Sequence, residues 1–508
     1  MRSDRVRDHA VASMVGAGVA LGVGELIAGL VDSVPSPVAA VGSQIVDGAP
    51  PWLEDFAIAV FGTADKGALA VGTVVVALVI AWFVGRVSVD RPLLVPVVFV
   101  GFAVVGGIAA VAEPLTAAGP IVVATVTSVA AGLAAHRAVR DRVPTIEEPT
   151  DALAENAARR RFLRATLAGG TVAVVSGVVG RRLLSATPTT PAVTIAPPQA
   201  SVPPPGPEHR VGTTGVTPVV VPNDEFYRID TALIVPRIDP GSWSLRVHGM
   251  VGDERTISYD ELLGMDLVED YVTIACVSNE VGGDLVGNAK WTGVRLTDVL
   301  DGVGVDPTRA TQLVGRSIDR WTAGFPTELA FDGREPLIAV AMNDEPLPAR
   351  HGFPARLIVP GLYGYVSATK WLTEIELTTW ESFDAYWIPR GWAKQAPIKT
   401  QSRIDIPAHR SRVPAGDVAV AGVAWAPLRG IERVEVRSEL GDWVEARLSE
   451  PLSSRAWVQW EAVLPLDRGA HRIRVRATDG DGVTQTDEVV PPRPDGATGH
   501  HTIRIDVV

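Results

Sequence analysis

The stretch VTIACVSNEVGGDLVGNAKWTGVRL, residues 272–296, contains Cys276, the only cysteine among 508 residues. The β-branched run Val272–Ala275 predicts a buried strand, and Cys276 follows where the sequence becomes polar and glycine-rich. A lone cysteine forms no internal disulfide, so this thiol is either packed as a small hydrophobe or used chemically. Residues that let a polar ligand approach the backbone surround it: Asn279, Gly282, Gly283, Gly287 and Asn288.

The same stretch resembles the cysteine-ligand segment of the sulfite oxidase family of molybdopterin oxidoreductases. The shared pattern is CVSN followed by GGxLxGNAxWTGVxL. In that family the cysteine thiolate binds molybdenum beside the dithiolene sulfurs of a pterin cofactor, and the resemblance gives this role to Cys276. A soft thiolate suits such a metal. The resemblance therefore implies a molybdenum–molybdopterin cofactor and a sulfite-oxidase-like α+β domain.

Further landmarks of the family occur in the same order along the chain. They are NDEFYR at 223–228, Trp321 to Pro326, HGFPAR at 351–356 and VPGLYGYVSATKW at 359–371. In the family such positions hold the pterin and its phosphate, which as an anion requires cations, hydroxyls and amides. The resemblance assigns cofactor binding to these residues: Asn223, Phe226, Tyr227, Cys276, Ser278, Asn279, His351, Arg356, Ser367 and Lys370. Taken singly, Arg356 could instead pair with an acid, and His351 could cap a turn.

Three residues are expected to act in catalysis. Beside Cys276, Arg228 matches an active-site arginine of the family, and Trp321 falls near a position where sulfite oxidases place tyrosine. Sulfite oxidases also have an arginine five residues after the cysteine, where this sequence has Val281. A dianion then loses one charge-assisted contact, worth roughly 1.5 to 3 kcal/mol. We therefore expect two-electron oxygen-atom transfer on a small, weakly charged or neutral oxygen donor or acceptor, with a sulfite oxidase or dehydrogenase proper, or a sulfoxide reductase, as alternatives.

The first third of the chain is strongly apolar. Hydrophobic residues make up 47% of the sequence, and its mean hydropathy is +0.20. Four stretches approach the ~20 residues that cross about 30 Å of hydrocarbon: Val11–Leu30, Gly67–Val84, Leu93–Val111 and Ala117–Ala135. Arginines flank them on alternate sides, while the loop that carries Asp32, Asp47, Glu54 and Asp55 has none, which predicts a cytoplasmic N-terminus. Glu25, near the end of the first span, is expected to reach the interface unless it has a function.

A fifth apolar stretch, Ala165–Val179, follows the basic string RRRFLR at 159–164. That string resembles the twin-arginine signal, whose machinery exports proteins already folded around their cofactors. The alternative is a basic flank for a fifth span. Either way, five crossings place the residues after Arg182 outside. We expect a multi-pass cell-membrane protein, in contact with lipid, with extracytoplasmic catalytic domains.

The expected domains follow from these patterns. They are a four-helix membrane domain (1–142), a cytoplasmic segment with the fifth helix (143–184), a proline-rich spacer (185–210), the molybdopterin-binding domain (211–400) and an immunoglobulin-like sandwich (401–508). In the fourth we expect a strand at Trp243–His248 and short helices at 258–263 and 296–302. In the sandwich, Asp479–Gly482 predicts a turn, since the spacing of a calcium loop is missing. In relatives the last domain often mediates dimerisation, so a homodimer is expected by analogy.

The sequence also limits the redox partners. It has no CxxCH motif and no second cysteine, which excludes a c-type haem and a cysteine-bound iron–sulfur cluster in this chain. The predicted spans contain no histidine, which argues against a bis-histidine haem there. Electrons must therefore pass to or from a separate cytochrome or quinone-linked partner. The net charge of −12 argues against nucleic acid. A membrane receptor, or a transporter with an attached binding domain, remains as a rival class, and neither needs Cys276.

Overall fold

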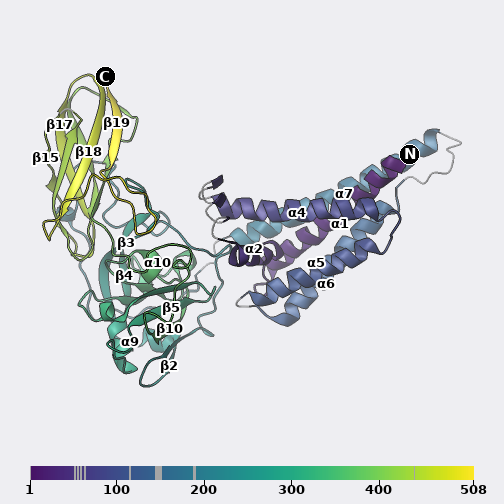
Figure 1. Cartoon of the computed structure of the whole chain (residues 1–508), viewed down its shortest axis with the longest axis horizontal. Helices are drawn as coiled ribbons and strands as arrows, with labels where there is room; N and C mark the ends of the chain where they lie inside the picture. Colours follow the sequence, from purple (N-terminus) through teal and green to yellow (C-terminus); the bar gives the residue numbers. More distant parts are fainter. Residues whose placement is uncertain are drawn as a thin grey trace. The chain divides into compact units, whose positions relative to one another are not determined.

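The computed structural model describes residues 2–50, 53, 56–57, 60–61, 64–113, 116–143, 152–186, 190–439 and 441–508. They form two compact units: Met1–Pro188 with Ala232–Arg237, and Thr189–Thr231 with Ile238–Val508 (Figure 1). The predicted loop acids Glu54 and Asp55, and most of the polar segment before the basic string, lie outside the described residues.

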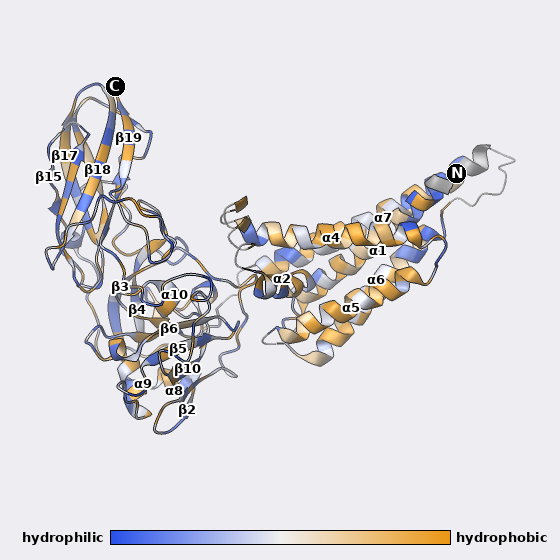
Figure 2. Cartoon of the chain, viewed as in Figure 1, coloured by the Kyte–Doolittle hydropathy of each residue, from blue (hydrophilic) through white to orange (hydrophobic). Residues whose placement is uncertain are grey.

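The first unit is helical. Its long helices are α1 (Arg2–Leu30), α4 (Asp65–Val87), α5 (Leu94–Ala112), α6 (Ala118–Arg140) and α7 (Ala152–Ser185). Among the described residues these five are long and apolar enough to cross a membrane, and apolar residues predominate along α4, α5 and α6 (Figure 2). Each predicted span coincides with part of one of them, although the third and fourth spans were predicted to start one residue before α5 and α6 begin. No sequence pattern predicted α2 (Pro37–Gly48), a short helix with proline at its start.

Helix α1 packs closely against α7 because glycines remove side chains at the contact. A Cβ on Gly22 would lie 2.4 Å from the carbonyl oxygen of Ala173. Two expectations are corrected here. Glu25, expected to reach the interface, is instead buried within the helical unit: it is 5% exposed and accepts hydrogen bonds from Ser36 and from the Val38 amide, at the start of α2, because a helix N-terminus leaves N–H groups without partners. The predicted spans contained no histidine, but helix α6 extends past the predicted end of the fourth span and so includes the buried His136.

The segment Ala232–Arg237 belongs to the helical unit although its neighbours in sequence belong to the other. Lys66 Nζ donates to the carbonyl oxygen of Ala232 at 2.9 Å. Arg237 donates to the carbonyl oxygen of Leu183 at 3.0 Å and pairs with Asp32. The chain that follows the NDEFYR landmark is thus fixed by polar contacts to three parts of this unit.

The second unit begins with two sheets and short helices. One sheet has the order β2-β1-β10-β5-β6 and contains β1 (Ser244–Gly249), β2 (Arg255–Ser258), β5 (Gln312–Ser317), β6 (Thr322–Pro326) and β10 (Leu372–Thr378). The other has the order β3-β4-β7-β8, with β9 paired to β7, and contains β3 (Leu267–Ala275), β4 (Val286–Arg295), β7 (Leu337–Met342), β8 (Glu345–Pro346) and β9 (Arg356–Ile358). The helices are α8 (Tyr259–Leu263), α9 (Leu296–Gly302) and α10 (Gly364–Ser367), with 3-10 turns η2 (Pro207–His209), η3 (Thr327–Ala330) and η4 (Ala349–His351).

The local predictions in this part are confirmed. In β1 the residues Leu245 and Val247 are fully buried, as the alternating pattern requires. Ser258 caps α8 in a reciprocal capping box with Glu261. The predicted strand before Cys276 is the end of β3, and the second predicted helix is α9.

The last part of the second unit is a two-sheet sandwich. One sheet has the order β11-β13-β17-β16, the other β12-β19-β18-β14-β15, and buried side chains from both form one core. The strands are β11 (Gln401–Ile406), β12 (Arg412–Val413), β13 (Gly416–Trp425), β14 (Ile431–Ser438), β15 (Val444–Glu445), β16 (Arg447–Leu448), β17 (Val458–Leu466), β18 (Gly469–Asp479) and β19 (Thr502–Val507). The sequence did not predict β11, which forms the edge of the first sheet. Asp479 holds the predicted turn by accepting from the amides of Asp481 and Val483.

The proline-rich segment is not a free spacer over its second half. The amide of Gln199 donates to the carbonyl oxygen of Leu267, and the amide of Glu269 donates to that of Ala200. These bonds cover β3, the edge strand of its sheet, whose backbone groups would otherwise lack partners. Tyr271 adds a hydrogen bond to the carbonyl oxygen of Pro203 at 3.1 Å.

Candidate active site

Cys276 lies one residue beyond β3, where the strand leaves its pairing with β4. Its amide donates to the carbonyl oxygen of Leu285 at 2.9 Å, and its own carbonyl accepts from the amide of Asn279 at 3.1 Å. The residue is 8% exposed. Burial raises the pKa of the thiol, while the amide and hydroxyl of Ser278 oppose this rise by favouring the thiolate.

The glycines after Cys276 fit protein groups, where the sequence suggested room for a ligand. A Cβ on Gly283 would lie 2.6 Å from Asn279 Oδ1, and one on Gly287 would lie 2.7 Å from the ring of Phe226. Asn279 Oδ1 also accepts from the Leu285 amide at 2.8 Å, which closes the loop. The loop is therefore rigid, and it fixes the position of the thiol.

Arg356, the first residue of β9, is a buried cation without an acidic partner among the described ion pairs. It is 4% exposed, and Nη1 donates to the carbonyl oxygen of His351 at 2.9 Å. Its guanidinium lies over the ring of Trp291 at 5.0 Å, and its buried Nε has no hydrogen-bond partner. Burial lowers its pKa to about 10, against the opposing effect of Tyr227. The ion-pair alternative for Arg356 is thus wrong, and its orphaned N–H suits an anion.

Other predicted cofactor ligands are engaged within the protein. His351 lies 2.8 Å from the carbonyl oxygen of Asn223, and burial lowers its pKa to about 3, so it is neutral and ties the NDEFYR segment to η4. The Asn223 side chain contacts Met342, Asn343 and Glu345. The Ser367 hydroxyl donates to the carbonyl oxygen of Tyr363 at 3.0 Å. Phe226 packs edge-on against the rings of Trp291 and His351. These side chains shape the site and are not free to bind a ligand as they stand.

Arg228 and Lys370 share one carboxylate, that of Asp230. Lys370 Nζ lies 2.6 Å and Arg228 Nε lies 2.7 Å from Asp230 Oδ2. The Asp230 and Lys370 side chains are 4% and 11% exposed, whereas that of Arg228 is 38% exposed. Burial lowers the pKa of Lys370 to about 8, although Asp230 opposes this change. Arg228 is therefore the member of this cluster that faces solvent.

Trp321 immediately precedes the hairpin strand β6 and is half-buried. Its amide donates to Asp319 Oδ1 at 3.1 Å. Asp319 is close enough to Asp230 and Lys370 for their charges to affect its pKa, which burial raises. The predicted catalytic tryptophan thus belongs to the same cluster as Arg228.

The structure brings the predicted residues together into one site. The charges of Cys276 and Arg356 both affect the pKa of Tyr227, which burial raises. The sequence analysis missed Asp230, Asp319, Trp291 and Tyr363, of which the last also senses the charge of Cys276. Trp291 and Tyr363 both lie in the motifs quoted above, which is the signal that could have found them. The two acids meet their partners through tertiary contacts that no local pattern shows.

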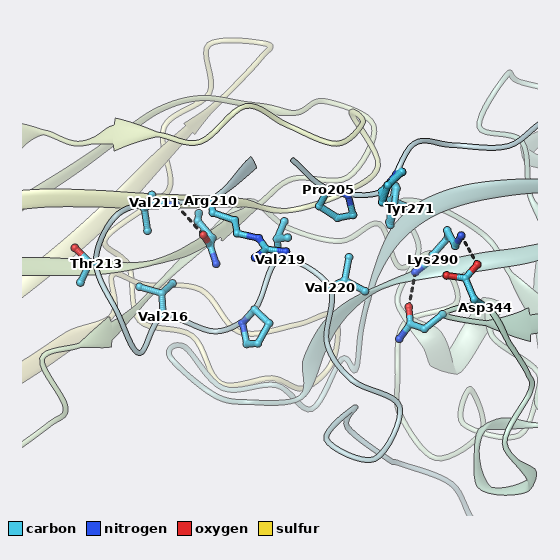
Figure 3. Close-up of a pocket in the computed structure, with 14 residues that line it drawn as sticks. Pro205, Arg210, Val211, Thr213, Val216, Val219, Val220, Tyr271, Lys290 and Asp344 are labelled. Atoms are coloured by element: carbon cyan, nitrogen blue, oxygen red, sulfur yellow. Dashed lines mark hydrogen bonds and ion pairs between the residues drawn. The ribbon is translucent and has the colours of Figure 1, made fainter. Parts of the chain in front are cut away.

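A separate cavity of about 420 Å³ lies beside the linker (Figure 3). Its walls include Pro205, Arg210, Tyr271 and the Lys290–Asp344 ion pair. None of the residues that line it is a predicted site residue.

Comparisons with known proteins identify a matching family model and several relatives. Residues 232–387 match the family model of the oxidoreductase molybdopterin binding domain. Mitochondrial sulfite oxidase of Homo sapiens is 29% identical over 329 residues, which cover 54% of this chain and 58% of that protein. Sulfite oxidase of Arabidopsis thaliana is 29% identical over 333 residues, which cover 54% and 84%. The chain thus spans little more than half the length of the mammalian relatives it matches.

A solved structure shows the same fold. The sulfane dehydrogenase SoxCD from Paracoccus pantotrophus superposes with a TM-score of 0.50 at 21% identity, over 58% of this chain and 82% of that chain. The fold, the family model and the relatives agree with the resemblance of the cysteine segment. In its second unit, this chain carries an oxidoreductase molybdopterin binding domain of the sulfite oxidase type.

Proposed function

We propose that the protein is a membrane-anchored molybdenum-cofactor oxidoreductase that transfers an oxygen atom to or from a small substrate outside the cytoplasm. One observation carries the proposal: a buried, unpaired thiol lies in the same site as a buried guanidinium that has no acid. Neither feature helps a receptor or a transporter. Burial of a guanidinium without an acid is costly in the folded protein unless a ligand satisfies it.

The residues fit the cofactor of the family. Cys276 offers one thiolate, and the described residues contain no group of three or more His, Cys, Asp or Glu side chains able to hold a metal. A metal bound here through one protein ligand needs its other ligands from a cofactor, as a pterin dithiolene supplies. The Arg356 guanidinium then holds an anionic part of the pterin, with the Tyr227 hydroxyl beside it.

The bound cofactor would supply the two-electron oxygen-atom transfer itself. The chain positions the reactants: Ser278 favours the thiolate form of Cys276, and Arg228 presents N–H groups to substrate oxygens at the exposed side of the site. Trp321 forms a neighbouring wall, where it limits the size of the substrate. The electrons leave or arrive through a separate cytochrome or quinone-linked partner.

The helical unit would anchor the enzyme. Five long apolar helices, with arginines at alternate ends, support a multi-pass topology with the residues after Arg182 outside. RRRFLR supports export by the twin-arginine route. The sandwich, whose two sheets share one core, supports an immunoglobulin-like domain, and by analogy with relatives it would mediate a homodimer.

Val281 and the Asp230 carboxylate favour a neutral or weakly charged substrate, such as a sulfoxide. Oxidation of sulfite remains the second candidate, because the curated relatives named above are sulfite oxidases.

Analysis of molybdenum and pterin in the purified full-length protein tests the proposal. We expect about one of each per chain, and Cys276→Ser should abolish turnover with an artificial electron carrier while keeping the unfolding temperature of the cofactor-free protein. Absence of molybdenum from active wild type, or full activity of Cys276→Ser, would overturn the proposal.

A further inference from the structure

A buried carboxylate partly neutralises the positive charges of Arg228 and Lys370, whereas no described ion pair neutralises Arg356. Asp230 Oδ2 accepts from both Lys370 Nζ and Arg228 Nε, and Asp230 Oδ1 lies 3.5 Å from Arg228 Nη2. The carboxylate is almost fully buried. Arg356 has no such acid among the described ion pairs. The charge of Arg356, which is available for the cofactor, is thus not reduced. The combined charge of Arg228 and Lys370, next to the exposed side of the site, is halved by Asp230.

A second carboxylate strengthens the effect. Asp319 lies on the turn before Trp321 and senses the charges of Asp230 and Lys370. Arg228, the solvent-facing member, therefore presents its N–H groups to a ligand with an acid already bound to the same guanidinium. A doubly charged oxyanion would have to compete with Asp230 at close range, where like charges repel strongly.

We propose that Asp230 determines substrate specificity by lowering the positive charge at the Arg228 side of the site, which selects against dianions and in favour of neutral or weakly charged oxygen-transfer substrates. The inference rests on the proposed function and deepens it by assigning the substrate class. Asp230 acts through Arg228 and Lys370, so it is a positioning residue.

The test compares Asp230→Asn with Asp230→Glu in the full-length, cofactor-loaded protein. The probe is sulfate, an unreactive dianion, and its binding is measured by the concentration dependence of the unfolding temperature, which needs no turnover. Removing one negative charge should tighten sulfate binding by about tenfold, and increase its dependence on ionic strength. Asp230→Glu keeps the charge and should bind sulfate within about twofold of wild type. The control is Asp253→Asn, an exposed carboxylate of the same unit, which should change nothing.

The direction of the change in sulfate affinity distinguishes an electrostatic role of Asp230 from a purely structural one. If Asp230 were only a structural ion-pair partner, its loss would disorder Arg228 and Lys370 and weaken sulfate binding. Kinetics add a second readout: Asp230→Asn should lower the KM for sulfite more than it changes kcat, and raise kcat/KM for sulfite relative to that for a neutral sulfoxide. Unchanged or weaker sulfate binding in Asp230→Asn overturns the inference. Absence of turnover on every substrate would refute the proposed function, and the sulfate result would still decide the role of Asp230.

Discussion

Replacing Arg356 by methionine should have opposite effects on the cofactor-free and the cofactor-loaded protein. Arg356 is 4% exposed, makes one described hydrogen bond through Nη1, and leaves Nε without a partner. In the cofactor-free protein this uncompensated charge is a cost, because burial of a cation without an acid is unfavourable. Methionine has a similar length and still packs on Trp291. The variant should therefore unfold at a temperature higher by about 2 °C or more without cofactor.

The loaded protein should respond in the other direction. Loss of a charge-assisted hydrogen bond to the anionic pterin removes roughly 1.5 to 3 kcal/mol, or at least tenfold in cofactor affinity. The assay measures pterin and molybdenum retained after dialysis, and unfolding temperatures of protein made with and without pterin synthesis in the host.

Arg334 provides the matched control. It is buried to a similar degree, at 9% exposed, but it pairs with Asp332 at 2.7 Å and donates to the carbonyl oxygen of Pro360. Arg334→Met breaks a satisfied ion pair, so it should destabilise both forms and leave cofactor affinity unchanged. If Arg356→Met destabilises the cofactor-free protein as Arg334→Met does, Arg356 is a structural residue and the reasoning fails.

Three other predictions address the substrate, the charge of the site and the topology. Val281→Arg should raise kcat/KM for sulfite at least several-fold, since it adds a charge-assisted contact; efficient sulfite oxidation by wild type, unaltered by the substitution, contradicts the reading of this position. Burial lowers the pKa of Lys370 to about 8, so this residue is charged below that pH and neutral above it. Sulfate binding should therefore weaken as the pH rises through about 8, whereas Lys370→Arg should bind sulfate equally below and above that pH. A titration of the unfolding temperature with sulfate at each pH would show this. A reporter fused after Val508 should be active only outside the cytoplasm, and Arg159→Lys with Arg160→Lys should block export; a cytoplasmic reporter refutes the topology, and unchanged export refutes only the twin-arginine route.

The elements of this fold that the sequence predicted are those with a strong local signal. Long apolar stretches predicted the five long helices, and alternation predicted β1. Helix α2 was missed because its twelve residues lie in a loop between spans, and its start depends on Glu25 from another helix. β11 was missed because it lies at the predicted boundary between the molybdopterin-binding domain and the sandwich. The packing of residues 199–203 on β3 has no periodicity of its own, since proline-rich chain pairs only where a strand edge is offered.

The same distinction between local signals and tertiary contacts applies to the site. Cys276, Arg356 and Arg228 were found through the family motifs, whereas their electrostatic differences were not. Arg356 and Lys370 received the same role from the sequence, yet among the described ion pairs an acid contacts Lys370 and none contacts Arg356, and the acid at Lys370 is 140 positions away along the chain. Whether a cation is available to a ligand depends on such contacts. Sequence motifs identify the charged groups, and tertiary structure decides which of them remain uncompensated.

The uncompensated groups also connect the site to the proposed export route. A buried guanidinium at Arg356 lowers the stability of the cofactor-free domain, and we expect cofactor binding at Cys276 and Arg356 to remove this cost, so loading and folding are thermodynamically linked. A domain built in this way is most stable after the cofactor has bound. Such a domain benefits from a route that carries folded, loaded proteins, which is the property that RRRFLR implies. A route that threads unfolded chain would require the cofactor to be inserted outside, where a domain that still lacks it would be in its less stable state.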